Sequence, residues 1–84
     1  MAEKKVGKIT HFFGNIGVAV IKLESKLKVG DEIHITGHSA DFTQKIESMQ
    51  VDHKSIKTAK SGDDVGMKVD EKVKPGAKVF LVEE

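Results

Sequence analysis

Leu27-Lys28-Val29-Gly30-Asp31-Glu32-Ile33 is the first of three stretches that share one pattern. The pattern is an apolar residue, Lys, any residue, Gly, Asp or Ala, any residue, and then Val or Ile. It recurs as Ala59-Lys60-Ser61-Gly62-Asp63-Asp64-Val65 and as Val73-Lys74-Pro75-Gly76-Ala77-Lys78-Val79. Pro75-Gly76 suits the two central positions of a type II turn, where the second residue takes a positive φ. We therefore predict the same turn at Gly30, Gly62 and Gly76, each leading into a strand.

Short segments rich in Val, Ile and Phe lie between these turns, and no window shows a helical stripe. Nearly every residue of Gly17 to Leu23 is apolar, which predicts a central strand covered on both faces or closed on its outer face by a loop. Six short antiparallel strands predict an all-β fold, a six-stranded closed antiparallel β-barrel, because closure removes exposed edges. The expected strands are Val6 to Phe13, Gly17 to Leu23, Glu32 to Thr36, Thr43 to Val51, Val65 to Val69 and Lys78 to Val82.

The composition is that of one soluble domain. The 84 residues are 38% apolar and 32% charged, so we expect a single domain over 1–84 with its core at about 6–82. The absence of Cys excludes disulfides, thiolate nucleophiles and Cys-based metal sites. The longest apolar stretch, Ile16 to Ile21, is too short to cross a bilayer, and no export signal is recognisable. We expect a cytoplasmic monomer without a membrane partner.

All positive charge apart from His comes from Lys. The chain has 14 Lys, no Arg and 13 acids, for a net charge of +1. Arg is the side chain that pairs bidentately with phosphate and guanine edges, whereas Lys acts as a mobile point charge. Sequence-specific reading of bases is therefore not expected.

The repeat, with Gly-x-x-Gly-Val-Ala-Val at 14–20 before it and Asp64-Val65-Gly66-Met67 at its second copy, resembles the second domain of elongation factor Tu and related translational GTPases. The likeness runs from about Val6 to Val82. In that family the domain is a six-stranded antiparallel barrel that helps hold the aminoacyl end of transfer RNA or contacts the small ribosomal subunit. The same barrel also occurs as a terminal domain of certain collagenase-like peptidases.

The sequence also departs from this family. No Gly-x-x-x-x-Gly-Lys-Ser/Thr phosphate loop is present, so neither nucleotide binding nor GTP hydrolysis is expected, and no cofactor is implied. The loop after the first strand reads Gly14-Asn15-Ile16-Gly17 and lacks the Arg found there in the family. The resemblance aligns Glu47 with an acidic residue that lies near the terminal adenosine of transfer RNA.

Two groups of residues could be read as sites for chemistry. His34 and His38, with Asp31 and Asp41 nearby, invite a metal site, but one His falls on a strand and the other in a turn. His38, Ser39 and Asp41 lie in one short turn, too local to build a catalytic triad. We therefore expect no metal and no enzymatic activity.

Two basic segments could contact phosphate, although such runs are usually solvated faces. One contains His53, Lys54, Lys57 and Lys60, and the other Lys4, Lys5, Lys8 and His11. Phe12 and Phe13 should face opposite sides of their strand, which leaves one of them to be packed under the loop or to stack on a base. The candidate RNA-binding residues are Phe13, Asn15, Glu47, Lys54, Lys57 and Lys60.

Two functional hypotheses follow. The first is a non-enzymatic binding module of the translation elongation factor type that contacts RNA or a ribonucleoprotein weakly through this Lys-rich surface, with transfer RNA, the ribosome or a translation-related protein as partner. The alternative is a protein-interaction domain that docks on a separate GTPase or peptidase chain. Salt dependence would separate the two, because phosphate contacts weaken steeply with ionic strength.

Overall fold

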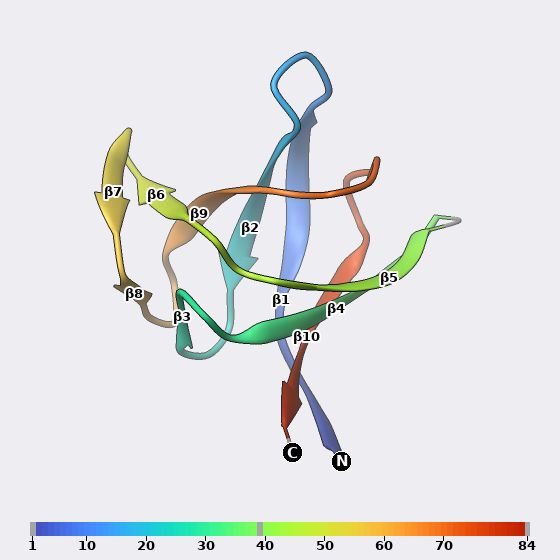
Figure 1. Cartoon of the computed structure of the whole chain (residues 1–84), viewed down its shortest axis with the longest axis horizontal. Helices are drawn as coiled ribbons and strands as arrows, with labels where there is room; N and C mark the ends of the chain where they lie inside the picture. Colours follow the sequence, from blue (N-terminus) through green and yellow to red (C-terminus); the bar gives the residue numbers. More distant parts are fainter. Residues whose placement is uncertain (1, 39, 84) are drawn as a thin grey trace.

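The computed structural model describes residues 2–38 and 40–83, which form strands joined by turns, so the predicted all-β class is confirmed. Figure 1 shows the strands wrapped around one interior, with the first and last strands side by side. The strands are β1 (Ala2–Phe13), β2 (Val18–Leu23), β3 (Leu27–Lys28), β4 (Glu32–Gly37), β5 (Ala40–Lys45), β6 (Met49–Val51), β7 (Lys54–Ile56), β8 (Thr58–Ala59), β9 (Asp64–Lys68) and β10 (Lys78–Glu83).

The predicted closed six-stranded barrel is wrong, because the main sheet has two free ends. Its eight strands run in the order β5-β4-β10-β1-β2-β9-β6-β7, and β3 pairs with β8 in a separate two-stranded sheet. The expected strand Thr43 to Val51 is interrupted: β5 ends at Lys45, β6 begins at Met49, and the intervening residues belong to neither strand. This break sends the chain to the far end of the sheet, so that β5 and β7 remain edges.

A buried Gln closes part of the gap between β5 and the end of β9. Gln44, 8% exposed, donates from Nε2 to the Lys68 carbonyl oxygen at 3.0 Å. The Asp70 backbone N–H donates to Gln44 Oε1 at 2.8 Å. One side chain thus forms hydrogen bonds with two backbone groups that have no strand partner there. Its own amide N–H and carbonyl are both paired as well, as a buried amide requires.

The long strand β1 belongs to both halves of the sheet because it is bent twice. It pairs with β10 from Ala2 to Lys8 and with β2 from Gly7 to Phe13. Its register shifts between Lys5 and Gly7 and again between Ile9 and His11. An extra residue in one strand bends it and increases the local twist, so these irregularities curl the sheet.

The three repeated turns share one conformation. The φ angles are 98° at Gly30, 92° at Gly62 and 98° at Gly76. In each copy the residue after the Gly donates its N–H to the carbonyl of the repeat's Lys, at 3.1 Å. A Cβ is disfavoured at this φ, which explains why the pattern keeps Gly.

Each turn is also attached to a buried residue of another segment by two backbone hydrogen bonds. The N–H of Gly76 donates to the Ile9 carbonyl, and the Ile9 N–H donates to the carbonyl of Ala77. The same exchange joins the second turn to Leu23 and the first to Ile46. All three anchor residues are at most 2% exposed. The repeat is therefore a device for attaching a turn to the core.

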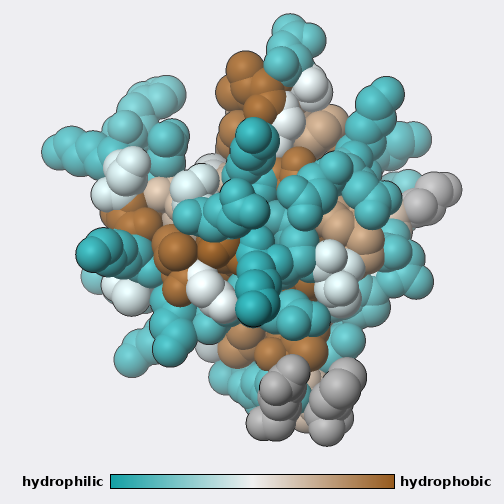
Figure 2. Space-filling view, viewed as in Figure 1, coloured by the Kyte–Doolittle hydropathy of each residue, from teal (hydrophilic) through white to brown (hydrophobic). Residues whose placement is uncertain are grey.

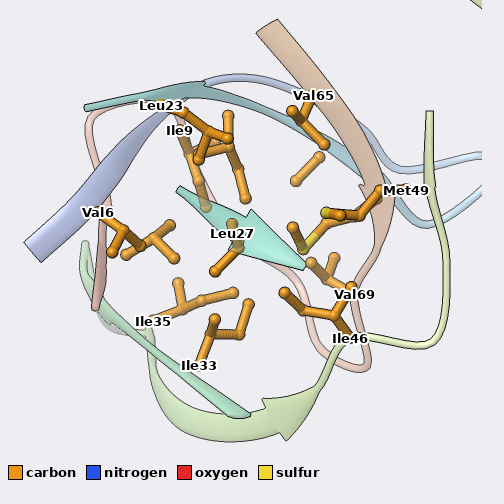
Figure 3. Close-up of a cluster of buried hydrophobic side chains, with 14 of the residues drawn as sticks. Val6, Ile9, Leu23, Leu27, Ile33, Ile35, Ile46, Met49, Val65 and Val69 are labelled. Carbon is orange, nitrogen blue, oxygen red and sulfur yellow. The ribbon is translucent and has the colours of Figure 1, made fainter. Parts of the chain in front are cut away.

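The core is aliphatic and lies inside the curl of the sheet (Figure 3). Leu27, from the two-residue strand β3, is 2% exposed and lies among side chains from the main sheet. β3 and β8 are not part of the main sheet, so the side chain of Leu27 enters the core from a separate segment and plugs one end of the interior. The buried residues are Val6, Ile9, Ala19, Ile21, Leu23, Leu27, Ile33, Ile35, Ile46, Met49, Ala59, Val65, Met67, Val69, Val73, Ala77 and Val79.

Within residues 2–38 and 40–83, no helix has the length and apolar character needed to span a membrane.

Candidate functional site

A shallow groove of about 310 Å³ lies on the outer face of the sheet. Its floor comes from β2 and β9. It is bordered by the tip of the β1–β2 hairpin, at the top of Figure 1, and by the turn between β6 and β7, at the left of Figure 1. We call it the outer groove. Its lining residues are Phe13, Ile16, Val18, Val20, Gln50, Asp52, His53, Asp64 and Gly66.

The floor of the outer groove is apolar because β2 is apolar on both faces. Ala19, Ile21 and Leu23 point into the core, and Val18 and Val20 alternate with them on the outer side, where they are only half-buried. The sequence predicts a strand that is covered on both faces or closed on its outer face by a loop, whereas in the structure Val18 and Val20 line an open groove. Gly66, opposite Val20 on β9, adds no side chain to the floor.

The hairpin tip raises two large apolar side chains beside this floor. Phe13 is 50% exposed and Ile16 is 65% exposed. Figure 2 shows hydrophobic surface gathered over this hairpin tip. Phe12 packs against the core instead, so the neighbouring aromatic residues do divide between the two sides of the strand. The ring of His11 stacks on Phe13 with 6.3 Å between centroids.

The opposite border is a two-residue turn that carries polar side chains in an uncommon conformation. Asp52 and His53 have φ angles of 52° and 65°, and the flanking residues Val51 and Lys54 are paired. Two successive positive φ angles define a type I′ hairpin turn, which usually contains Gly at its second position. His53 instead places a ring at the edge of the outer groove.

The structure does not gather the predicted RNA-binding residues at one place. Phe13 lines the outer groove, whereas Lys60 lines a separate hollow with Lys26, Thr58 and Ala59. Asn15 is exposed in the hairpin turn, and Glu47 is exposed between β5 and β6. Lys54 and Lys57 are exposed on and just after the edge strand β7. The groove residues Val18, Val20, Asp52 and Asp64 were missed as site residues. The two-faced apolar pattern of β2 contained a signal for the two valines, and no local pattern marked the two acids.

The two basic segments also lie apart in the sheet. Lys4, Lys5, Lys8 and His11 are on β1, and Lys54 is on β7, with β2, β9 and β6 between these strands. Lys5 is paired with Glu24 at 3.4 Å, so part of its charge is locally balanced. The two groups of lysines are therefore not on neighbouring strands, and they do not form one continuous row of positive charge along paired strands.

His34 lies between two carboxylates on the outer face of the sheet. Its Nδ1 is 2.9 Å from Glu3 Oε1, and its Nε2 contacts Asp41 Oδ1. These contacts join β4 to β1 and to β5. Since Glu3 and Asp41 lie on opposite sides of the ring, they do not converge on one point. Within the described residues no group of three or more His, Cys, Asp or Glu side chains is arranged to hold a metal ion; the suggested partner His38 lies in the turn after β4.

The hydrogen bonds to Asp41 and Glu3 raise the pKa of His34 above its usual value of 6.5, and partial burial opposes them. A raised pKa in the folded state means that folding favours the protonated ring. The resulting stabilisation of the folded protein is complete below about pH 6.5 and is lost as the pH rises through the folded pKa.

We expect the stability advantage of wild type over His34→Gln to shrink from about pH 6 to about pH 9 in urea denaturation. An advantage that stays constant over this range would contradict the assignment; His11→Gln serves as the control.

Comparison with known proteins gives relatives among proteases. The chain is 36% identical over 81 residues to an uncharacterized protease of Methanocaldococcus jannaschii, covering 95% of this chain and 20% of that protein. It is 36% identical over 77 residues to a collagenase of Porphyromonas gingivalis, covering 89% of this chain and 21% of the collagenase. The chain therefore spans about a fifth of the length of these curated relatives. No family model matches the sequence.

Two solved structures share the fold of this chain. The crystal structure of the C-terminal domain of a Geobacillus thermoleovorans protein described as a U32 peptidase superposes with a TM-score of 0.89 at 20% identity, covering 95% of this chain and 93% of that one. Its selenomethionine variant gives a TM-score of 0.87 at 22% identity, covering 90% of this chain and 96% of that one.

These findings correct the family and function expected from the sequence. The chain matches proteases, a collagenase and a U32 peptidase C-terminal domain, so its identification with the second domain of elongation factor Tu is wrong. The translation-type, RNA-binding function and its partners, transfer RNA, the ribosome or a translation-related protein, are wrong for the same reason. The repeat on which the resemblance was based joins turns to the core by backbone hydrogen bonds. A structural role of this kind indicates the fold and does not indicate the activity.

Proposed function

We propose that this chain is one non-catalytic domain that binds an extended polypeptide segment in the outer groove and acts together with a peptidase. The observation that carries the proposal is the open apolar outer face of β2, flanked by the exposed side chains of Phe13 and Ile16. The protease relatives supply the context, since about four fifths of each lies outside the matched region. We assign peptide-bond cleavage to those other parts.

The size of the outer groove favours a chain segment over a large protein face. A volume of about 310 Å³ accommodates one or two side chains. A stable interface between folded proteins buries about 800 Å² on each partner, which is more than this shallow feature offers. An extended segment needs only one anchoring side chain in an apolar pocket, and such anchors dominate binding energy.

The proposal predicts that the double variant Phe13→Ser/Ile16→Ser binds denatured polypeptide about 30-fold more weakly than wild type, because each exposed anchor contributes about 1 kcal/mol and the variant removes both. Gelatin is a suitable probe because one relative is named a collagenase, and denatured casein is a second probe of different composition. Binding is measured by biolayer interferometry on the immobilised polypeptides.

The matched control is Val29→Ser, which removes an apolar side chain that is 37% exposed but does not line the outer groove. It should bind like wild type. Circular dichroism and urea midpoints check that all variants remain folded. If wild type binds neither polypeptide, or if the double variant and the control bind equally, the outer groove is not a polypeptide-binding site.

A further inference from the structure

We propose that the outer groove selects segments in which an apolar side chain stands next to a Lys or Arg. This inference rests on the proposed function and adds the chemistry of the bound segment. It is carried by the charges at the border of the apolar floor. Asp52 and Asp64 are the acidic side chains of the lining, and none of the 14 lysines is part of it.

Both carboxylates lie at the border of the apolar floor. Gln50 on β6 is paired with Gly66 on β9, and the pairing of these two strands ends there. Asp52 lies in the turn after β6 and Asp64 begins β9, and both side chains line the outer groove. A cationic side chain bound in this groove would therefore meet carboxylates next to the apolar floor.

The surrounding lysines do not already satisfy these acids. Lys22 is the register partner of Asp64, and Lys54 follows the β6–β7 turn. Neither lines the outer groove. The ion pairs found among the described residues join Lys5 to Glu24 and His34 to Glu3 and Asp41, and none involves Asp52 or Asp64. Both carboxylates therefore remain available to a partner, next to a floor that takes an apolar side chain.

The test uses three fluorescein-labelled nonapeptides with identical Gly-Ser flanks and Leu-Lys, Leu-Glu or Ser-Lys at their centre. Fluorescence polarisation measures their affinities for the full chain. Each exposed ion pair changes affinity by about two- to five-fold, so Leu-Lys should bind about ten-fold more tightly than Leu-Glu. Ser-Lys should also bind more weakly than Leu-Lys, because it lacks the apolar anchor. Added NaCl should reduce the preference for Leu-Lys over Leu-Glu.

The double variant Asp52→Asn/Asp64→Asn should lose this charge preference while remaining folded, because Asn tolerates the positive φ at Asp52. The control Glu71→Gln/Glu83→Gln changes the net charge equally but lies outside the outer groove, and it should keep the preference. Equal binding of Leu-Lys and Leu-Glu to wild type would overturn the inference, as would a preference that survives in the Asp variant. Failure of all three peptides to bind would also overturn it, whereas loss of gelatin and casein binding is what overturns the proposed function.

Discussion

Leu27→Ala is expected to lower the free energy of unfolding by about 2–5 kcal/mol, which is the usual cost of replacing a fully buried Leu by Ala. Leu27 is 2% exposed and lies among side chains of the main sheet, although its own strand has two residues. The cavity left by the truncation should not collapse easily, because the first repeated turn is fixed to Ile46 by two backbone hydrogen bonds. Urea denaturation followed by circular dichroism measures the effect.

The matched control is Val29→Ala, two residues further along the chain and 37% exposed. It removes apolar atoms from the same segment without opening a buried space, so its cost should stay within about 0.5 kcal/mol. Equal costs for the two variants would mean that Leu27 does not plug the interior, and that the two-stranded sheet β3–β8 is peripheral to the core.

Gly7→Ala is expected to destabilise the protein by about 3 kcal/mol, at the upper end of the range for overpacking. A Cβ at this position would lie 2.7 Å from Ile21 Cγ2 and 2.8 Å from the carbonyl oxygen of Lys22. The second contact is with backbone inside the β1–β2 ladder, so relief requires moving a strand rather than rotating a side chain. Thermal and urea unfolding of the variant provide the measurement.

Gly66→Ala controls for the change from Gly to Ala within a strand. Its Cβ would meet Val18 Cγ1 at 3.6 Å, which is ordinary contact, and it should change the free energy of unfolding by less than about 1 kcal/mol. If Gly7→Ala is as mild as this control, the close approach of β1 and β2 does not constrain position 7.

The outer groove accounts for a feature of the sequence that packing leaves unexplained. A strand that is apolar on both faces is normally buried on both, yet Val18 and Val20 face an open groove. Exposed apolar surface of this kind typically marks an interaction site. The protease relatives make polypeptide the natural occupant to test, and the two unpaired carboxylates give that test a charge dependence.

The sequence by itself determined the elements that depend on local chemistry. The sequence predicted a strand over Glu32 to Thr36, and β4 spans Glu32–Gly37 with Ile33 and Ile35 buried. The Pro75-Gly76 pair predicted a turn with positive φ, and Gly76 has a φ of 98°. These properties follow from periodicity and from the steric freedom of Gly, both of which act over a few residues.

Only the tertiary structure decided how those elements meet. The break between β5 and β6 leaves the sheet open, and Gln44 bridges part of the gap to residues 68 and 70. The outer groove likewise joins hairpins from distant parts of the chain, which brings Asp52 and Asp64 to the border of one apolar floor. Such contacts depend on which edges pair and where the chain bends. A local pattern specifies neither, because each strand's hydrogen bonds can be satisfied by more than one neighbour.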